Sequence, residues 1–461
     1  MPVNSFENYP MTWKPVIDRT AKPLYLSLAN QLKQDILNGS ILPGTKLPPH
    51  RELADFLDIN VSTVSKAIKV CELKGLLSAT VGNGTFVSFS ALSNAYLLAD
   101  SKPINIIEMG ATIPESSSYK PLMSQLQNIV NERDLAKWFG YMRAGDMQWQ
   151  KDAAVKLMHK GGYYTNSESI LFSNGGQNAL TAILIGLCTH GDKIGADPHT
   201  YPGLKTTASM LGIQIIPIKH EHEEMDGDAL IYACKNEKIK GIYLIPDYQN
   251  PTTHRMSLTR RKALAQIAKE YNIFIIEDAA YHLMCKHPMQ AVGTFAPDQT
   301  IYIASLSKTI GPGLRVAYLS VPDQYRRAIS NALYNMNISV TPIMAELAAR
   351  MIVSNKIDTI IKNHRKNTID RNLLVDHYLS KYITSSENTG IFRWLKLPSS
   401  ISGTEFEILA LSHGVQIYAA ERFTVGNSIP EKAIRLSIGA PATIDELEEG
   451  LKILLKLLRS L

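Results

Sequence analysis

The sequence is poor in cysteine and has no long apolar run. Its 461 residues include four cysteines, widely spaced and without a CxxC pair, so a disulfide framework is not expected and a reducing compartment is the ordinary setting. No apolar run reaches the roughly 18–20 residues that a bilayer-spanning helix needs. Glu7 and Asp18 stand in an N-terminal segment without the apolar core of a secretory signal. These features predict a cytoplasmic protein that does not insert into a membrane.

The chain also lacks a strong excess of charge of either sign. Its formal net charge at pH 7 is +6, with 20% charged and 45% hydrophobic residues. This composition is typical of a globular protein with a sizeable core, and the length leaves room for two or three domains. The small positive charge permits a nucleic-acid partner but does not argue for one.

Residues 23–37 carry apolar side chains at every fourth position, which predicts a helix. These side chains are Leu24, Leu28, Leu32 and Ile36. Asn38-Gly39 is C-terminal punctuation for this helix, and the proline-rich stretch 42–49 cannot be helical.

Two shorter helices and a hairpin are predicted to follow. The helices cover about 51–57 and 62–73, and residues 76–89 alternate around Gly82-Asn83-Gly84. This order is the layout of a winged helix-turn-helix, whose second helix enters the DNA major groove. The short polar and basic side chains on the opening turns of that helix are Ser62, Thr63, Ser65 and Lys66. A small helical interaction domain is the alternative, since this part of the chain is only slightly basic.

The same region closely resembles the GntR-type winged-helix domain of bacterial regulators. The matching strings are LPGTKLPPHRELADFLDI, STVSKAIKVCELKGLL and GNGTFV. The resemblance implies that Arg51 is the family's basic residue at the start of the second helix, and that Asn83 lies between the two wing glycines as a further DNA contact. Pro49 stands where a serine is usual, and Val61 stands where many members carry an arginine.

From about residue 104 onward, short apolar stretches alternate with helical ones. The clearest apolar stretches are 170–172, 241–245, 273–276 and 301–303, and the clearest helical ones are 178–187 and 260–271. The alternation predicts an α/β fold with a mainly parallel sheet. We expect a DNA-binding domain over 1–88, a linker over 89–103, and an α/β domain over 104–461 with a large subdomain (about 140–330) and a small one (about 331–461).

Four residues in a fixed order can bind pyridoxal 5'-phosphate (PLP). Lys308 stands thirty residues after Asp278, Tyr281 belongs to the same Asp-x-x-Tyr unit, and Asn250 stands twenty-eight residues before Asp278. A lysine forms an imine with the cofactor aldehyde, and an aspartate keeps the pyridine nitrogen protonated. The asparagine and the tyrosine can hydrogen-bond to the ring hydroxyl. Asp278 and Asn250 follow predicted strands, where ligands of parallel sheets collect.

A second group of residues fits the phosphate of that cofactor. Gly175, Gly176 and Gln177 follow a predicted strand and open a helix, so that backbone amides can approach an anion. Ser305 and Ser307 can donate their hydroxyls to the same group. Arg315, seven residues beyond Lys308, can supply a bidentate charge.

The chain from about residue 105 to 461 resembles the fold-type I aminotransferases. The matching strings are SNGGQNAL, TYPG, YQNPTT, EDAAY, SLSKTIGPGLR and AIRLSIG. The resemblance implies that Lys308 is the Schiff-base lysine, that Tyr201 stacks on the ring, that Tyr141 reaches the phosphate of a neighbouring subunit, and that Arg435 grips a substrate carboxylate. The glycines usual after the NPT motif and after Arg315 are missing, and Tyr201 stands one residue later than in most members.

No metal site is expected. The stretch 220–224 reads His-Glu-His-Glu-Glu and lies in a charged segment, so it is interpreted as a solvated turn.

The order of the two regions resembles the MocR family of bacterial transcription regulators. That resemblance implies a homodimer that binds promoter DNA and carries PLP on its lysine, with a small amino compound as effector. A working aminotransferase with an appended DNA-binding domain is the main alternative, because every residue type that transamination needs is present. A PLP-binding scaffold without regulated genes is a third reading.

Overall fold

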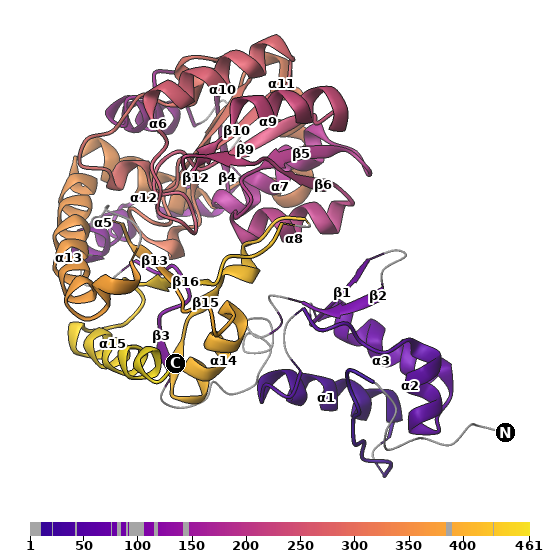
Figure 1. The fold of residues 1–461 in the computed structure, drawn as a ribbon. Helices are drawn as coiled ribbons and strands as arrows, with labels where there is room; N and C mark the ends of the chain where they lie inside the picture. Colours follow the sequence, from indigo (N-terminus) through magenta and orange to yellow (C-terminus); the bar gives the residue numbers. More distant parts are fainter. Residues whose placement is uncertain are drawn as a thin grey trace. The chain divides into compact units, whose positions relative to one another are not determined.

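The structure, a computed structural model, describes residues 11–20, 22–41, 44–74, 76–80, 84–88, 91, 106–114, 119–141, 147–383, 390–426 and 428–461. It divides into two compact units (Figure 1). The first comprises Met1–Ile106 with Thr404–Gly414, and the second comprises Ile107–Gly403 with Val415–Leu461.

The N-terminal part of the first unit folds into helices followed by an antiparallel hairpin, as the sequence predicts. The elements are α1 (Leu24–Leu37), α2 (His50–Leu57), α3 (Val61–Leu73), β1 (Leu77–Thr80) and β2 (Gly84–Val87). Gly82 and Asn83 lie outside the described residues, and so does the expected linker apart from Ala91.

A single apolar core holds these elements together. Its buried side chains include Leu28, Leu32, Ile36, Leu53, Val64 and Cys71. Leu24, the first member of the predicted apolar stripe, is only partly buried. Asn60 caps α3, since its side-chain oxygen accepts a hydrogen bond from the Ser62 amide at 2.8 Å. The cap fixes where the second helix of the helix-turn-helix begins.

The second unit is built on a seven-stranded sheet with the order β4-β12-β11-β10-β9-β5-β6. The strands are β4 (Ile170–Ser173), β5 (Lys193–Ala196), β6 (Gln214–Pro217), β9 (Gly241–Leu244), β10 (Phe274–Asp278), β11 (Thr300–Ser305) and β12 (Ala317–Ser320). Only β12 runs antiparallel to its neighbours, so the predicted mainly parallel sheet is confirmed. The carboxyl ends of β4, β9, β10 and β11, which precede candidate site residues, therefore lie at the same edge of the sheet.

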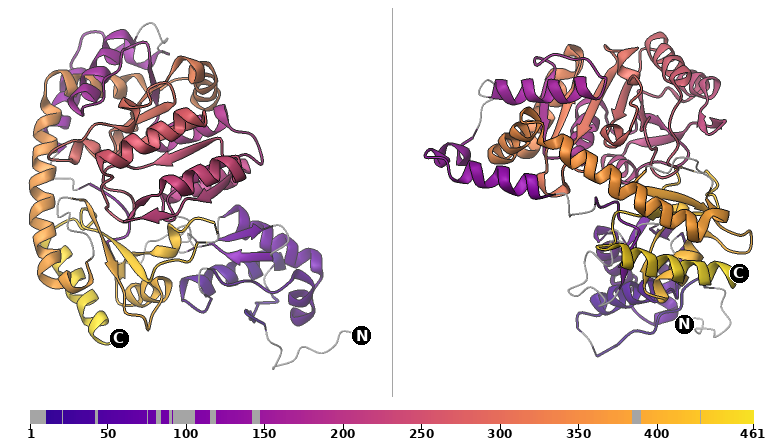
Figure 2. Two further views of the ribbon diagram at one scale, coloured as in Figure 1. Left: turned by 45° about the horizontal axis from the view of Figure 1, so that its top comes forward. Right: turned by 90° about the vertical axis from the view of Figure 1, so that its left-hand side faces the viewer.

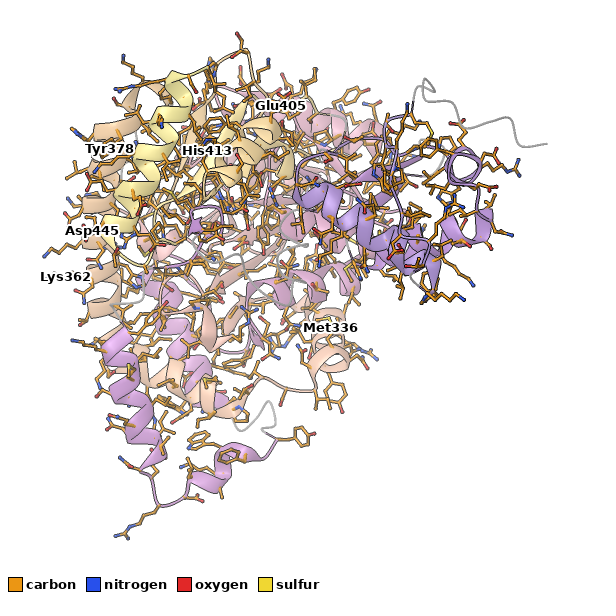
Figure 3. The ribbon with its side chains drawn as sticks, turned by 90° about the horizontal axis from the view of Figure 1, so that it is seen from below. Met336, Lys362, Tyr378, Glu405, His413 and Asp445 are labelled. Carbon is orange, nitrogen blue, oxygen red and sulfur yellow. The ribbon has the colours of Figure 1, made fainter. Side chains whose placement is uncertain are left out.

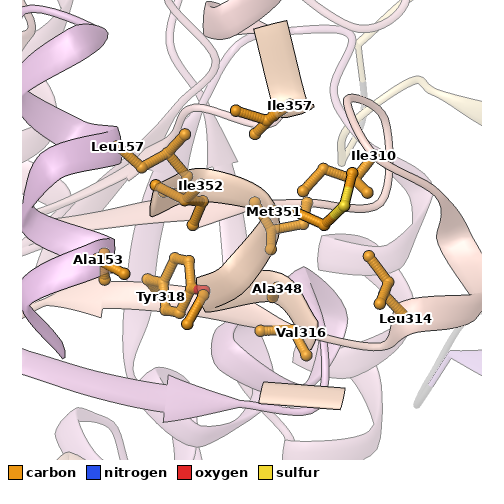
Figure 4. Packing of buried hydrophobic residues seen from close by; sticks show 14 of the residues in the cluster. Ala153, Leu157, Ile310, Leu314, Val316, Tyr318, Ala348, Met351, Ile352 and Ile357 are labelled. Carbon is orange, nitrogen blue, oxygen red and sulfur yellow. The ribbon is translucent and has the colours of Figure 1, made fainter. Parts of the chain in front are cut away.

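Helices cover both faces of this sheet (Figures 1 and 2). On one face, α6 (Gln148–Lys160) and α12 (Pro342–Val353) pack on Tyr318 and Val316, a contact shown in Figure 4. On the other face, α7 (Gly176–Leu187) and α11 (Asp323–Asn337) pack near Leu319. Tyr318 and Leu319 are consecutive residues of β12, and they serve opposite cores because strand side chains alternate.

Further helices belong to the large part. They are α5 (Lys120–Val130), α8 (Pro202–Leu211), α9 (Gly227–Tyr232) and α10 (Leu258–Glu270). Among them, α10 packs against β9 and β10 through Leu264 and Ile275. The predicted helices over 178–187 and 260–271 correspond to α7 and α10, each beginning two residues earlier than expected.

A smaller sheet and two long helices form the C-terminal part of the second unit. The elements are α13 (Lys356–Leu379), β13 (Phe392–Lys396), β15 (Tyr418–Ala419), β16 (Ala433–Ser437) and α15 (Ile444–Arg459), with the strand order β13-β16-β15. Tyr378 on α13 donates a hydrogen bond to Glu448 on α15 at 2.5 Å, and Figure 3 shows Tyr378 beside that helix. A short parallel pair joins β3 (Ile107–Glu108) to β14 (Val415–Gln416).

Among the residues described above, no helix has both the length and the apolar character needed to cross a bilayer.

We predict that the N-terminal core tolerates loss of volume poorly. Leu53 on α2 is fully buried, so Leu53→Ala should lower the free energy of unfolding of this region by about 2–5 kcal/mol. Leu73→Ala is the matched control, because Leu73 is 78% exposed in the same domain and its truncation should change stability by less than about 0.5 kcal/mol. Hydrogen exchange of the full-length chain measures both, and equal effects would contradict the packing described.

Candidate functional site

The phosphate-binding expectation centres on the N-terminus of α7, where helix amides lack intrahelical acceptors. Gly175 has a φ of +89°, and a β-carbon on it would lie 2.6 Å from a guanidinium nitrogen of Arg315. A β-carbon on Gly176 would lie 3.4 Å from the Ser305 hydroxyl. Arg315 also donates to the Asn174 carbonyl at 3.0 Å. The structure thus brings the glycine turn, Ser305 and Arg315 together around one small space.

Gln177 and Tyr201 lie on the α8 side of this cradle. The Gln177 amide donates to the Gly203 carbonyl at 3.1 Å and to the Thr207 hydroxyl at 2.8 Å. A β-carbon on Gly203 would collide with the Tyr201 ring at 2.3 Å, so the ring lies against the start of α8. Burial raises the pKa of Tyr201, and the Asp278 charge adds to that shift. Tyr201 therefore lies near the expected pyridine partner, as a ring-stacking residue must.

Lys308 follows β11 and donates a hydrogen bond to the Thr112 carbonyl. Burial, together with the positive charge of Arg435, lowers the pKa of Lys308 to about 8, although the Asp278 carboxylate acts in the opposite direction. A substantial fraction of this amine is therefore neutral near physiological pH, which is the form that attacks an aldehyde. Ser307, beside it, is half-buried, and its amide donates to the Ser305 hydroxyl at 3.4 Å.

Asp278 ends β10, and two donors hold its carboxylate. Tyr243 on β9 donates its hydroxyl to one oxygen at 2.7 Å, and the Ala280 amide donates to the other at 3.1 Å. Burial raises the pKa of Asp278, while these two hydrogen bonds and the Lys308 charge favour the ionised form. Sequence reasoning missed Tyr243, although a single hydroxyl in an otherwise aliphatic strand is a signal that could have found it.

Arg435 on β16 and Asn250 are direct partners. The Arg435 guanidinium donates to the Asn250 side-chain oxygen at 2.6 Å and to the Gly110 carbonyl at 2.6 Å. Its central carbon lies 4.7 Å from the Phe423 ring centroid and 5.4 Å from that of Tyr418. Burial lowers the pKa of Arg435. Sequence reasoning gave no role to the Gly110–Thr112 stretch, which accepts hydrogen bonds from both Arg435 and Lys308.

Tyr281 is buried near the same group. Its ring packs edge-on against Phe392, with the centroids 5.4 Å apart, and Phe392 in turn lies 5.4 Å from the Arg435 guanidinium carbon. Burial raises the pKa of the Tyr281 hydroxyl, so this group stays protonated and able to donate.

These residues fit PLP. The side chains that line the α7 N-terminus leave no room for a β-carbon at Gly175, which suits close approach of a phosphate to the backbone. Within the described part of the chain, nothing accepts from the Arg435 Nε or donates to the Gln177 side-chain oxygen, although both atoms are buried. An amine, a buried carboxylate and an anion cradle at one sheet edge are the complement that the cofactor needs.

Tyr141, expected to reach a neighbouring subunit, is 80% exposed. It lines a cavity of about 730 Å³ together with Phe172, Asn174 and Tyr334. Asn174 adjoins the glycine turn, so the cavity borders the phosphate cradle.

The candidate DNA-binding side chains are accessible on the first unit. Ser62 and Lys66 on α3 and Arg51 on α2 are exposed, and Thr63 is half-buried. Ser65 is also half-buried, and its hydroxyl lies 3.1 Å from a ring nitrogen of His50. Asn83 lies outside the described residues. His50, which links the two helices at this face, has no counterpart in the sequence-based prediction.

In the histidine-rich stretch, His222 and Glu223 form an exposed turn, as expected, between the two-residue strands β7 (His220–Glu221) and β8 (Glu224–Met225). Arg260 donates to Glu221 at 2.9 Å, and His220 bonds Asp197 at 2.8 Å. No group of three or more potential metal ligands occurs among the residues that the structure describes.

We predict a distinctive pH dependence for the reaction of Lys308 with PLP. Only the neutral amine attacks, so the rate of adduct formation should rise with pH and level off above about 8. Arg435→Met should move the midpoint to higher pH, because the Arg435 charge lowers the pKa of Lys308. Stopped-flow absorbance over pH 6–11 (roughly the range between histidine and lysine titration) measures this, and a wild-type midpoint near that of an ordinary lysine would be the contrary result.

We also predict that Tyr243 supports cofactor affinity through Asp278. Tyr243→Phe removes one hydrogen bond to a buried carboxylate, which should weaken PLP binding about tenfold or more. Tyr318→Phe is the control, because the Tyr318 hydroxyl is buried with no hydrogen-bond partner in the described chain. Equal PLP affinities of the two variants in equilibrium titrations would count against this role.

Comparison with protein families gives two matches. Residues 118–454 match the family described as aminotransferase class I and II, and residues 24–87 match the gntR family of bacterial regulatory proteins. The first match covers most of the chain, and the second covers α1 to β2.

Individual relatives agree with both matches. The chain is 63% identical to the HTH-type transcriptional regulator YdeF of Bacillus subtilis (strain 168) over 461 residues, which is the full length of both proteins. An archaeal alanine:glyoxylate aminotransferase shares the fold with a TM-score of 0.71 and 23% identity, covering 77% of this chain and 91% of its own. LysN, the α-aminoadipate aminotransferase of Thermus thermophilus solved with N-(5'-phosphopyridoxyl)-L-leucine, does so with a TM-score of 0.68 and 21% identity, covering 77% and 92%.

A GntR-type helix-turn-helix domain precedes a fold-type I aminotransferase domain, and the full-length relative is a transcriptional regulator. The chain is therefore a transcription regulator that belongs to the MocR-type family.

Proposed function

We propose that this regulator binds PLP through Lys308 and changes its affinity for promoter DNA when PLP, or an amino compound held beside it, occupies the site. The observation that carries the proposal is the convergence of Lys308, Asp278 and Arg315 at one sheet edge, in a chain that also carries a winged helix-turn-helix. When bound, PLP supplies an aldehyde for an amine and an electron-withdrawing pyridine ring.

Each candidate residue has one task in this proposal. The α7 amides of Gly176 and Gln177, the hydroxyls of Ser305 and Ser307, and Arg315 hold the phosphate. Asp278 holds a proton on the pyridine nitrogen, and Tyr243 keeps the Asp278 carboxylate oriented.

The ring and its substituents have their own contacts in this proposal. Asn250 and Tyr281 bind the ring hydroxyl, and Tyr201 covers one ring face. Arg435 binds the carboxylate of the amino compound, since its guanidinium is buried, points toward Asn250 and has an Nε with no acceptor in the described chain.

Coupling to the DNA-binding unit is proposed to run through residues 107–112. This stretch directly follows Ile106, where the N-terminal segment of the first unit ends. Its carbonyls at Gly110 and Thr112 accept hydrogen bonds from Arg435 and Lys308, the two side chains that ligands would engage. A ligand that competes for these donors binds more weakly when the donors are bonded to the two carbonyls than when they are released. This difference in affinity is what a ligand-driven shift between two states requires.

We propose a homodimer as the working form. Exposed apolar side chains gather near the cavity beside the phosphate cradle, with Tyr141 80%, Tyr334 62% and Ile338 54% exposed. A second copy of the chain that covers this surface would bring its Tyr141 toward the neighbouring phosphate. A dimer also presents two winged helices to two half-sites of an operator. A regulator of this kind works in the cytoplasm, where the DNA is.

Aminotransferase activity is the second candidate. The Arg435–Asn250 pair beside Lys308 favours it, because an α-amino acid held by its carboxylate would present its α-carbon to a lysine able to move a proton. Release of the corresponding 2-oxo acid from amino acids, measured by chromatography, distinguishes turnover from ligand sensing alone.

The deciding experiment measures binding of the protein's own upstream DNA with and without PLP and a panel of amino acids. We expect a ligand-dependent change of about 5- to 150-fold in the wild type and none in Lys308→Ala. Lys66→Ala should weaken DNA binding in both ligand states and reduce the slope of log affinity against log salt by about 1. Lys456→Ala, an exposed lysine on α15, is the control for loss of a single charge.

If Lys308→Ala keeps the same ligand-dependent change as the wild type, sensing through this lysine is wrong. If the wild type binds PLP and DNA but neither affects the other, the chain is a PLP-binding protein whose DNA binding is independent.

A further inference from the structure

The loop that carries Asn250 runs from the end of β9 to the start of α10 and is closed at its base. The Met256 amide donates to the Pro246 carbonyl at 2.8 Å, and the Gln249 amide donates to the His254 carbonyl at 2.8 Å. Asn250 lies at the far end of this closed loop and faces Arg435. The position of its side chain therefore depends on what holds residues 246–256.

A buried arginine on α10 clamps both ends of that loop. Arg261 has no exposed surface. Its Nε donates to the Met256 carbonyl at 3.1 Å, and one terminal nitrogen donates to the Pro246 carbonyl at 3.1 Å and to Asp247 at 2.8 Å. The other terminal nitrogen donates to the Gln290 carbonyl at 3.1 Å and to Asp247 at 3.4 Å. All five N–H groups of the guanidinium are used within this one cluster.

Asp247 is the acceptor at the centre of the cluster. Besides Arg261, its carboxylate accepts from the Arg255 Nε at 2.9 Å and from the His282 Nδ1 at 2.6 Å. Burial opposes ionisation, but the His282 hydrogen bond and the Arg261 charge outweigh it, so the pKa of Asp247 lies well below its usual range. Asp247 is a fixed negative charge three residues before Asn250.

His282 connects the cluster to Tyr281, the other residue expected to bind the ring hydroxyl, because the two residues are adjacent in the chain. Its other ring nitrogen faces the Gly161 carbonyl. Both ring nitrogens therefore contact acceptors, which requires a proton on each, and His282 is an imidazolium. Burial lowers the pKa of His282, but its contacts with Asp247 raise it above the usual value. Tyr281 is thus held next to a charge that is bonded to the Asn250 loop.

We propose that the Asp247 carboxylate, through Arg261 and His282, is the common positioning group for Asn250 and Tyr281, and so for the two hydrogen bonds to the ring oxygen of the ligand. This inference rests on the proposed PLP function and adds a positioning residue to it. Asp247 touches neither the expected cofactor contacts nor Lys308. It acts on them by fixing two loops that arrive from different strands.

The cluster could instead serve only the stability of the fold. Three cations (Arg255, Arg261 and His282) face Asp247, and two of them, Arg261 and His282, also act on the nearby buried Glu277. Glu277 accepts from the Val292 and Gly293 amides at 3.0 and 2.8 Å. Loss of the Asp247 charge leaves these cations under-compensated, so a drop in thermal stability is expected on either view. A readout that follows the ring oxygen is needed to separate positioning from stability.

Glu346 offers a matched control. It is a buried carboxylate on α12 that accepts from the Trp149 Nε1 at 3.1 Å, the Gln150 amide at 3.0 Å and the Arg350 Nε at 2.7 Å. None of these partners belongs to the candidate cofactor site. Glu346→Gln and Asp247→Asn therefore make the same chemical change in two buried ion clusters, only one of which holds the ring ligands.

The experiment compares full-length wild type, Asp247→Asn and Glu346→Gln in three measurements: thermal unfolding, the PLP dissociation constant, and the pH midpoint of the absorbance band of PLP bound to Lys308. The pH midpoint reports on the ring oxygen of PLP, because the hydrogen bonds to that oxygen influence the proton affinity of the Lys308 nitrogen that is bound to PLP. For Asp247→Asn we expect a dissociation constant about tenfold or more higher and a displaced pH midpoint. For Glu346→Gln we expect reduced thermal stability with the dissociation constant and the midpoint of the wild type.

A milder variant covers the case in which Asp247→Asn does not fold. Arg255 is only partly buried, and Arg255→Gln removes one of the donors to Asp247 while leaving Arg261 and His282 in place. We expect a smaller displacement in the same direction. If Asp247→Asn, or Arg255→Gln in its place, loses thermal stability but keeps the wild-type dissociation constant and pH midpoint, the cluster is purely structural and the proposal is overturned. If the wild type itself forms no PLP band, the proposed function fails, and the positioning role fails with it.

Discussion

The parallel register of β9, β10 and β11 brings Asn250, Asp278 and Lys308 to the same edge of the large sheet. Glu277 pairs with Leu244 and Asp278 pairs with Ile303, so three neighbouring strands end together at one edge. Asp278 and Ser305 are the last residues of β10 and β11, and Asn250 and Lys308 lie in the loops that follow β9 and β11. A slip of one residue in β10 would turn Asp278 to the opposite face and separate it from Tyr243.

Burial at this edge of the sheet favours the neutral forms of both Asp278 and Lys308. The pKa of Asp278 rises and that of Lys308 falls to about 8, both chiefly through desolvation. Arg315 and Arg435 add two positive charges, so the site as a whole favours an anion. A ligand with a phosphate, a carboxylate and a protonated ring nitrogen offsets all of these groups at once. The electrostatics therefore support the same ligand class as the geometry, on independent grounds.

Chain order predicted much of this site because its central residues lie in recognisable strings at strand ends. Lys308, Asp278 and the glycine turn needed only a parallel sheet to bring them together. The contacts that prediction missed join residues with no shared pattern, since Tyr243 is 35 residues from Asp278 and Gly110 is 325 residues from Arg435. Such contacts are set by packing of side chains across elements, and the sequence of one element does not contain that information.

Regulation by a ligand requires that the ligand bind two arrangements of the protein with different affinity. A rigid cofactor site would bind its ligand tightly and still change nothing at the DNA. In the proposed regulation, the Gly110 and Thr112 carbonyls supply such a difference, since they use the same donors that a carboxylate or an aldehyde would engage. They lie on a stretch that is also tied to β14 and β16, because the Met109 amide donates to the Gln416 carbonyl at 2.8 Å and the Ser437 amide donates to the Met109 carbonyl at 2.7 Å. Under the proposed function, occupancy at the donors can therefore act on a segment that directly follows Ile106 of the first unit, without any change in the large sheet that carries the candidate cofactor residues.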